Sequence, residues 1–377
     1  MSKYWMLFLS AVTMIAAARP AAAAKVEVGS CLAGLPKFST IQAAVSGVPP
    51  FSTILVCPGV YPEQVTISQP LTLRGQGINN MDRPVVAVPQ SLPGGGPGLK
   101  VNVTSINGEP FAAQVLVQNV TPVGKVTIID MTVDGTGGNL GCPAGTGLAG
   151  IFYASGTEGS VEGVTARNQQ NSGCGFGIWV ENGAGPNQTI IVGNDSVHDM
   201  DSAGIVALSN QNPPTLAVTI ETSSVTGNNS TQGIVSEGVS GTIYSNIVTG
   251  GAIGIVDVDF FQQTPGIATS YNSVADVQAG AGIGIVVRGG STATHNKISN
   301  VLTAFYLQGG SAANPGPTLL ANTAKNTALG VEFNCTANTT LNSNFNDSQV
   351  GFDNVPSGTS LPTAIYNIDT IKTGSCP

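Results

Sequence analysis

The chain has few charged and few aromatic residues. Of its 377 residues, 9% are Asp, Glu, Lys or Arg and 6% are Phe, Trp or Tyr. It lacks the runs of about ten residues rich in Leu, Glu, Lys and Arg that helical repeats need, which excludes a helical solenoid. Its 13 Lys and Arg residues and net charge of −8 argue against nucleic acid and anionic polymers as partners. A neutral glycan is electrostatically acceptable.

Long apolar runs are absent beyond the first residues. Lys3 precedes an apolar stretch through Ala18, and Ala22-Ala23-Ala24 supplies small residues for cleavage. This pattern is typical of a secretory signal peptide, so we expect residues 1–24 to be removed and residues 25–377 to form a single domain, secreted or periplasmic. No later segment is long and apolar enough to cross a bilayer.

Cysteines in a Cys-x-x-Cys spacing are also absent, which argues against a zinc or thiol-redox site. An even number of cysteines in an oxidising compartment predicts disulfides. Residues near in sequence lie in the same or adjacent repeats, and this favours the pairs Cys31–Cys57, Cys142–Cys174 and Cys335–Cys376.

What the chain does contain is a loose repeat of 20 to 30 residues. A Gly or Ala followed by an apolar residue begins each unit, and a second apolar run follows within it. A repeat of this size indicates one supersecondary unit stacked on itself. The units begin at Gly150, Gly177, Gly204, Gly233, Gly254, Gly284, Ala304, Gly330 and Gly351. Two short strands per unit, separated by turns rich in Gly, Asn and Ser, predict an all-β solenoid.

Asparagine follows a similar period in the second half of the chain. Asn246, Asn272, Asn296, Asn322 and Asn344 are 22 to 26 residues apart, at or just after the second strand of each unit. Stacked coils would place these amides about 4.8 Å apart, the interstrand spacing. We expect a structural amide ladder that satisfies the backbone groups of a sharp turn.

The segment before the repeats predicts a cap for the open end of the solenoid. Ser39-x-x-Gln42 is a capping-box pattern, and Pro49-Pro50 ends the short helix that it begins. One face of this helix is apolar, with Ile41, Ala44 and Val45.

Residues 39–77, STIQAAVSGVPPFSTILVCPGVYPEQVTISQPLTLRGQG, resemble the N-terminal cap and first coil of pectin-lyase-like right-handed parallel β-helix proteins. The arrangement is most similar to pectin methylesterases and to periplasmic β-helix proteins related to the copper-site maturation factor of nitrous oxide reductase. The resemblance implies a right-handed parallel β-helix with a short N-terminal capping helix. Residues 25–77 would form the cap and first coil, and residues 330–377 the C-terminal coils and cap.

The catalytic motifs of these families do not carry over. Pectin methylesterases use a Gln-Asp and an Asp-Phe-x-Phe-Gly motif, but no Gln-Asp is present and Asp259-Phe260-Phe261-Gln262 departs from the second. Gly59-x-Tyr61-x-Glu63 matches the esterase pattern alone, and we interpret it as a strand-turn signature. Polygalacturonase and pectate-lyase motifs are absent, so the resemblance implies a fold but no particular activity.

The strand period of two predicts which side chains face outward. Counting each Gly or Ala start as zero, positions +1 and +3 point inward and positions +2 and +4 outward. The +2 row is mainly apolar and contains Phe152, Trp179, Val206, Val235, Val256, Val286 and Tyr306. The +4 row adds Glu181, Glu237 and Arg288 to this apolar ribbon.

One hypothesis makes this face a carbohydrate site. Glu181 and Glu237, two coils and roughly 9.6 Å apart at the interstrand spacing, would flank a glycosidic bond, near the upper end of the separation in inverting glycosidases. Arg288 would complete the catalytic set. Sugar rings would stack on Phe152, Trp179 and Tyr306. The chain would then be a polysaccharide hydrolase or lyase, or a binding protein.

The alternative is that a long loop or another subunit covers the apolar ribbon, since exposed apolar stripes of this length are unusual on monomers. The chain would then be a non-catalytic structural or surface-interaction protein, with a homo-oligomer or a surface partner docked on the ribbon.

No cofactor is predicted. The weak metal-ligand candidates are His198, Asp199 and Asp201, which could supply oxygen ligands to calcium or a nitrogen to a transition metal. They lie in a predicted turn, where Asp commonly bonds its own backbone. Asp257 falls at an inward position, which indicates either a satisfied polar core residue or a shifted register.

Overall fold

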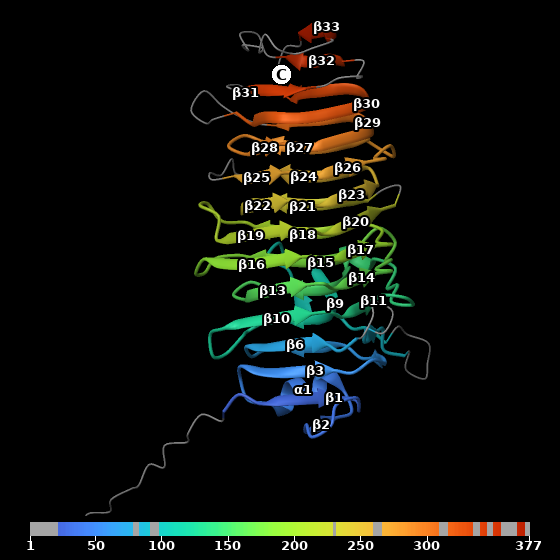
Figure 1. Cartoon of the computed structure of the whole chain (residues 1–377), viewed down its shortest axis with the longest axis vertical. Coiled ribbons are helices and arrows are strands. Elements are labelled where there is room, and N and C mark those ends of the chain that lie inside the picture. The colour runs from blue at the N-terminus through green and yellow to red at the C-terminus, as the bar shows by residue number, and fades with distance from the viewer. Residues whose placement is uncertain are drawn as a thin grey trace, which may run out of the picture.

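The computed structural model describes residues 22–77, 83–90, 98–228, 231–258, 266–308, 316–334, 340–344, 350–355 and 368–373. The chain winds into a stack of parallel coils with the N-terminal strands at one end and β32 and β33 at the other (Figure 1). Within those ranges, none of the helices is both long and apolar enough to span a bilayer. The predicted signal peptide falls almost wholly outside them.

Three parallel faces, A, B and C, run along the stack. Face A contains β5 (Val65–Ile67), β9 (Pro110–Val117), β12 (Gly147–Tyr153), β15 (Gly175–Asn182), β18 (Ala203–Ser209), β21 (Gln232–Glu237), β24 (Ile253–Val258), β27 (Ile283–Arg288), β32 (Val350–Val355) and β33 (Ile368–Thr373).

Face B contains β1 (Lys25–Val28), β3 (Ser52–Val56), β6 (Leu71–Gly75), β10 (Lys125–Ile129), β13 (Glu158–Glu162), β16 (Gln188–Gly193), β19 (Leu216–Glu221), β22 (Ser240–Tyr244), β25 (Ile267–Ser270), β28 (Thr292–Thr294) and β31 (Thr340–Asn344).

Face C contains β4 (Val60–Pro62), β7 (Val85–Ala87), β11 (Thr132–Asp134), β14 (Thr165–Arg167), β17 (Ser196–His198), β20 (Ser224–Gly227), β23 (Ile247–Gly250) and β26 (Ser273–Ala275). The long strands β29 (Lys297–Gln308) and β30 (Thr318–Asn334) bend across more than one face. Two short strands lie beside the faces, β2 (Lys37–Phe38) along β1 and β8 (Val103–Thr104) antiparallel to β9.

The glycine at the start of each face A strand has a steric cause. A Cβ on Gly233 would lie 2.4 Å from the carbonyl oxygen of Gly254 in the next coil and 2.4 Å from Cγ1 of Val248. Gly177, Gly204 and Gly254 meet the same two kinds of neighbour. The repeat in the sequence therefore marks the points where a valine of face C packs against the backbone of face A.

The predicted amide ladder is confirmed for the described residues. The Nδ2 of Asn246 donates to Oδ1 of Asn272 at 3.0 Å, and Asn272 to Asn296 likewise. Asn296 donates to Asn322 at 2.9 Å. Each Nδ2 also donates to a strand carbonyl of the preceding coil, as that of Asn246 does to Ile220 at 2.9 Å. Asn344 lies at the end of β31, and its side chain is outside the described set.

The ladder sits at the corner between faces B and C. Two residues join the faces in coil after coil, and the first has a left-handed backbone with φ between 50° and 63°. These residues are Asp130, Gly163, Asn194, Thr222, Ser245, Tyr271, His295 and Ala321. Non-glycine residues adopt this conformation at a cost, which the ladder offsets by satisfying the adjoining backbone N–H groups.

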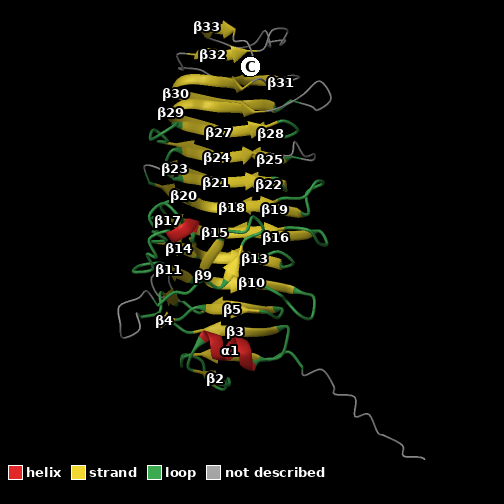
Figure 2. Cartoon of the chain, turned by 180° about the vertical axis from the view of Figure 1, so that it is seen from behind, coloured by secondary structure: helices red, strands yellow, loops and turns green. Residues whose placement is uncertain are grey.

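Helix α1 (Ile41–Gly47) lies at the N-terminal end of the stack (Figure 2). Ile41, Ala44 and Val45 are buried in the core, as predicted. The capping box is wrong by one residue, because Thr40 is the N-cap and its hydroxyl accepts from Ala43 N. The carboxylate of Glu63 accepts the first two helix N–H groups at 2.8 Å each, a role that matches the interpretation of its motif as structural.

Two of the three predicted disulfides are present, Cys31–Cys57 and Cys142–Cys174. Cys335 and Cys376 lie outside the described residues.

Candidate functional site

The side chains of face A divide into two apolar clusters, as the strand period predicts. Inward positions such as Ile178 and Val180 belong to the core that runs through the coils. Outward positions form a second cluster on the outer surface of the same strands. This apolar ribbon contains Phe152, Trp179, Val206, Val235, Val256 and Val286, each no more than 9% exposed.

Residues 101–109, here called the strap, extend over the ribbon near β12 and β15. The strap contains β8, and the turn after it leads back into β9. The side chain of Asn102 makes two hydrogen bonds to the backbone of Ala113, at 2.9 and 3.0 Å. Val103 and Ile106 pack against the ribbon. Part of the ribbon is thus covered by a loop of the same chain, as one of the sequence hypotheses required.

The aromatic residues of the ribbon pack against one another. Phe111 lies with its ring centroid 5.1 Å from that of Phe152 and 4.8 Å from that of Trp179, and Phe176 lies 4.9 Å from Trp179. Phe152 is fully buried, so its predicted exposure to a sugar ring is wrong. Tyr306 packs at the other end of the ribbon, in register with Val286, and does not join this cluster.

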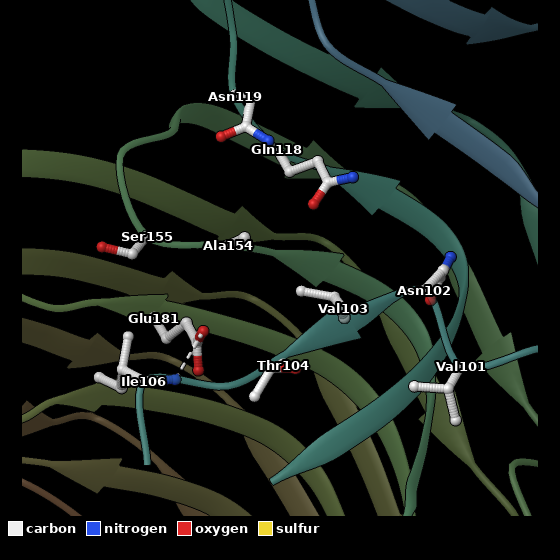
Figure 3. A pocket seen from close by; sticks show the side chains of 10 residues that line it. All are labelled: Val101, Asn102, Val103, Thr104, Ile106, Gln118, Asn119, Ala154, Ser155 and Glu181. Carbon is white, nitrogen blue, oxygen red and sulfur yellow. Dashed lines mark hydrogen bonds between the residues drawn. The ribbon is translucent and has the colours of Figure 1, made fainter. Parts of the chain in front are cut away.

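Glu181 lines an open cavity of about 560 Å³, and residues of the strap form one wall of this cavity. The Oε2 of Glu181 accepts from Nε1 of Trp179 at 2.9 Å. Its Oε1 accepts from the backbone N–H of Ile106 at 3.1 Å, as Figure 3 shows. The other polar side chains around the cavity are amides and hydroxyls, from Asn102, Thr104, Gln118, Asn119 and Ser155.

The carboxyl of Glu181 is 1% exposed. Its pKa is raised to about 7, chiefly by burial and to a smaller extent by nearby Glu109, while the hydrogen bonds from Trp179 and Ile106 act in the opposite direction. A carboxyl that carries a proton near neutral pH can donate a hydrogen bond or act as a general acid.

Glu237 lies in a different cavity. The register Glu181, Leu208, Glu237 across β15, β18 and β21 confirms the predicted two-coil separation. However, Glu237 lines a second cavity of about 370 Å³ with Phe176 and Trp179, and Glu181 is not among the residues that line it. The structure therefore does not bring the two carboxyls together around one bond.

Arg288 is not on an accessible surface. It is 3% exposed, and its Nε donates to Oδ1 of Asp257 at 3.0 Å while one terminal nitrogen donates to the carbonyl of Val239 at 3.0 Å. Because Arg288 is the last residue of β27, its side chain can bend around the strand end into the interior. Asp257 is a buried inward residue, so the register holds, and burial raises its pKa to about 6 against the effect of Arg288.

The weak metal candidates do not converge. Nδ1 of His198 lies 2.6 Å from Oδ2 of Asp199. Asp201 instead accepts backbone N–H groups from Asn171, Gly173 and Gly175 at 2.6 to 2.9 Å. Across the described ranges, the one group of metal-ligating atoms close together is Glu27 with Cys31 and Cys57, whose sulfurs form a disulfide.

Sequence reasoning missed the strap and the polar lining of the cavity. The available signal was Asn107-Gly108, because Asn-Gly between strand-forming residues is a strong hairpin pattern. The pairing of β8 with β9 around this turn would have placed residues 101–109 beside face A.

Comparisons with known proteins support the fold. No protein-family model and no curated protein sequence matches the chain. A GH136 lacto-N-biosidase from Eubacterium ramulus matches with a TM-score of 0.58 and 10% identity, over 88% of this chain and 64% of that one. A polygalacturonase from Erwinia carotovora ssp. carotovora matches with a TM-score of 0.49 and 10% identity, over 88% and 98%. The A-module of an Azotobacter vinelandii mannuronan C-5 epimerase matches with 0.46 and 14%, over 82% and 90%.

The fold is therefore a right-handed parallel β-helix, as the N-terminal segment predicted. At these identities the likeness concerns the fold and not the activity.

Proposed function

We propose that the protein binds a neutral carbohydrate in the cavity beside the strap and that Glu181, in its protonated form, donates a hydrogen bond to it. The observation that carries the proposal is the buried carboxyl of Glu181, with a pKa of about 7, beside a cavity of about 560 Å³. Sugar hydroxyls both donate and accept, which suits a lining of amides and hydroxyls.

The chemistry of the cavity also bears on the ligand's charge. The described lining contains no Lys or Arg, and the chain has a net charge of −8, so an acidic polysaccharide would meet repulsion without compensation. A carbohydrate ligand agrees with the name of the lacto-N-biosidase that shares the fold. The two disulfides favour an oxidising, secreted or periplasmic location.

If the bound sugar is cleaved, Glu181 is the general acid. Turnover then requires its protonated form and falls as pH rises through about 7. Docking of a protein on the apolar ribbon has less support, because the ribbon's side chains are already buried within this chain.

The test is binding and product release on a panel of neutral and acidic glycans, at pH 5.5 and pH 8.5. Asn119→Ala and Ser155→Ala, which remove lining groups, are expected to weaken binding of any neutral glycan that the wild type retains. Glu181→Gln is expected to abolish turnover. Glu221→Gln, on face B, serves as the matched control and should bind as the wild type does. Equal binding by the lining variants and the wild type, or no binding across the panel, would contradict the proposal.

A further inference from the structure

The strap is held to face A by few polar contacts. Its tip donates one backbone hydrogen bond to the sheet, from Ile106 N to Glu181 at 3.1 Å, and accepts one at the Ile106 carbonyl from Nδ2 of Asn210 at 3.3 Å. Its base is fixed by Asn102, bonded to Ala113. Between base and tip, the turn bonds to itself, with Ser105 accepting from Glu109. The tip can therefore leave the sheet while the base stays in place.

We propose that docking of the strap on face A depends on pH: the strap is closed while Glu181 is protonated, which keeps its side of the cavity wall in place, and is released when Glu181 ionises. This inference rests on the site of the proposed function and concerns its regulation. It needs no ligand, because the switch lies between two parts of the same chain.

The direction of the switch follows from which state tolerates the charge. In the closed strap Glu181 is buried, and burial is the largest influence on its pKa, which rises to about 7. Opening returns water to the carboxyl, and its pKa falls towards the ordinary value of 4.5. The state with the higher pKa is the one that protonation favours. The closed strap is thus most stable below about 4.5 and loses that advantage as pH rises to about 7.

Glu109, the charged strap residue that acts on Glu181, also favours opening when Glu181 ionises. Glu109 belongs to the strap, is exposed, and raises the pKa of Glu181, so ionised Glu181 and Glu109 repel each other across the interface. From the sheet, Trp179 and Leu208 flank Glu181 and carry no charge near neutral pH. Glu237 lies two coils away and lines the other cavity. Of the two hydrogen bonds that Glu181 accepts, the one from Ile106 joins strap and sheet and opposes opening at high pH, whereas the one from Trp179 lies within β15.

Hydrogen exchange of the backbone amides of residues 101–109 tests the proposal on the full chain, between pH 4.5 and 8.5, after correction for intrinsic exchange. The opening constant is expected to rise up to about tenfold per pH unit between about 4.5 and 7, the slope for release of one proton, and to level off above. Glu181→Gln should make it independent of pH. Glu109→Gln should make it level off at a lower pH, because removal of the repulsion lowers the pKa of Glu181.

A second readout locates the proton. Trp179 is the one tryptophan of residues 25–377, the expected mature chain, so tryptophan fluorescence reports on it alone. This fluorescence should titrate near pH 7 in the wild type but not in Glu181→Gln. Glu221→Gln should keep the wild-type profile in both assays. A flat exchange profile in the wild type, or an unchanged slope in Glu181→Gln, would overturn the switch. Glycan binding with a flat exchange profile would support the proposed function and contradict the switch. A pH-dependent exchange profile without glycan binding would support the switch and contradict the proposed function.

Discussion

Replacing Asp195 with Asn should stabilise the protein, and more so as pH rises. Asp195 extends the amide ladder by way of Ser223, whose hydroxyl accepts from Asp195 N at 3.1 Å and whose N–H donates to Asn246 at 2.9 Å. Its Oδ1 accepts from Val164 N at 2.7 Å. The Oδ2 of Asp195 is also buried and has no hydrogen-bond partner within the described structure. At the same position, each asparagine of the ladder has an NH₂ group, which donates to a strand carbonyl.

The magnitude follows from this single atom. Burial raises the pKa of Asp195 well above its ordinary value, and the hydrogen bond from Val164 and the charge of Arg83 do not offset it. A raised folded pKa means that the contribution to stability is complete below the unfolded value of 3.8 and is lost as pH rises through the folded value. An unsatisfied buried group costs about 1–3 kcal/mol, so Asp195→Asn should gain about that much at pH 8 and little at pH 4.

The assay is urea unfolding at both pH values, with the midpoint and slope compared between variants. Asn272→Asp is the matched reverse change and should destabilise the protein, most strongly at pH 8. A loss of stability in Asp195→Asn at pH 8 would refute the reasoning, since it would mean that an ionised Asp195 stabilises the fold through Arg83. A gain independent of pH would equally show that protonation of Asp195 plays no part.

Three further predictions concern stability, each measured by denaturant or thermal unfolding. Arg288→Met leaves Asp257 buried without its partner and should cost about 3–5 kcal/mol, and an unchanged midpoint would show that the pair is not buried in solution. Glu63→Ala removes the carboxylate that accepts the first N–H groups of α1 and should cost about 1–2 kcal/mol, whereas Gln64→Ala, next to it, should leave the helix cap intact. Gly233→Val places atoms within 2.4 Å of two neighbours and should cost about 1–3 kcal/mol, and a stability equal to that of the wild type would contradict the account of the glycine row.

The parts of the fold that the sequence predicts are those set by contacts between equivalent positions of adjacent coils. Gly233 meets Gly254, and Asn246 meets Asn272, so the same requirement recurs in each unit and appears as a period. The α1 cap was predictable because its apolar face lies within one helical segment and appears as a local pattern in the sequence. The capping box failed by one residue because Glu63, from the loop after β4, accepts the Gln42 N–H that the Ser39 side chain would accept in that motif, and the Gln42 side chain accepts from Thr66 N instead.

The site was less predictable because it depends on pairs with no period. Ile106 and Glu181 are 75 residues apart, and no feature of either repeat position indicates the other. Asp257 and Arg288 illustrate the same limit, since alternation places Arg288 outward and only the strand end allows it to turn inward. The outward row itself was correct, but alternation cannot tell an exposed outer face from one covered by another segment.

From β10 onward, two residues form every corner between faces B and C, and this has a consequence for how the architecture can vary. An inserted residue at this corner would displace the ladder amides from their hydrogen bonds to the next coil. We therefore expect each pair of B and C strands to behave as one rigid unit. In the coils from β10 onward, length changes are confined to the other two corners, where the loop after β15 lies, and the strap lies at one of these corners in the preceding coil. New loops can thus be added around the cavity without disturbing the stack, and graft sites for altering what the protein binds are to be sought at those corners alone.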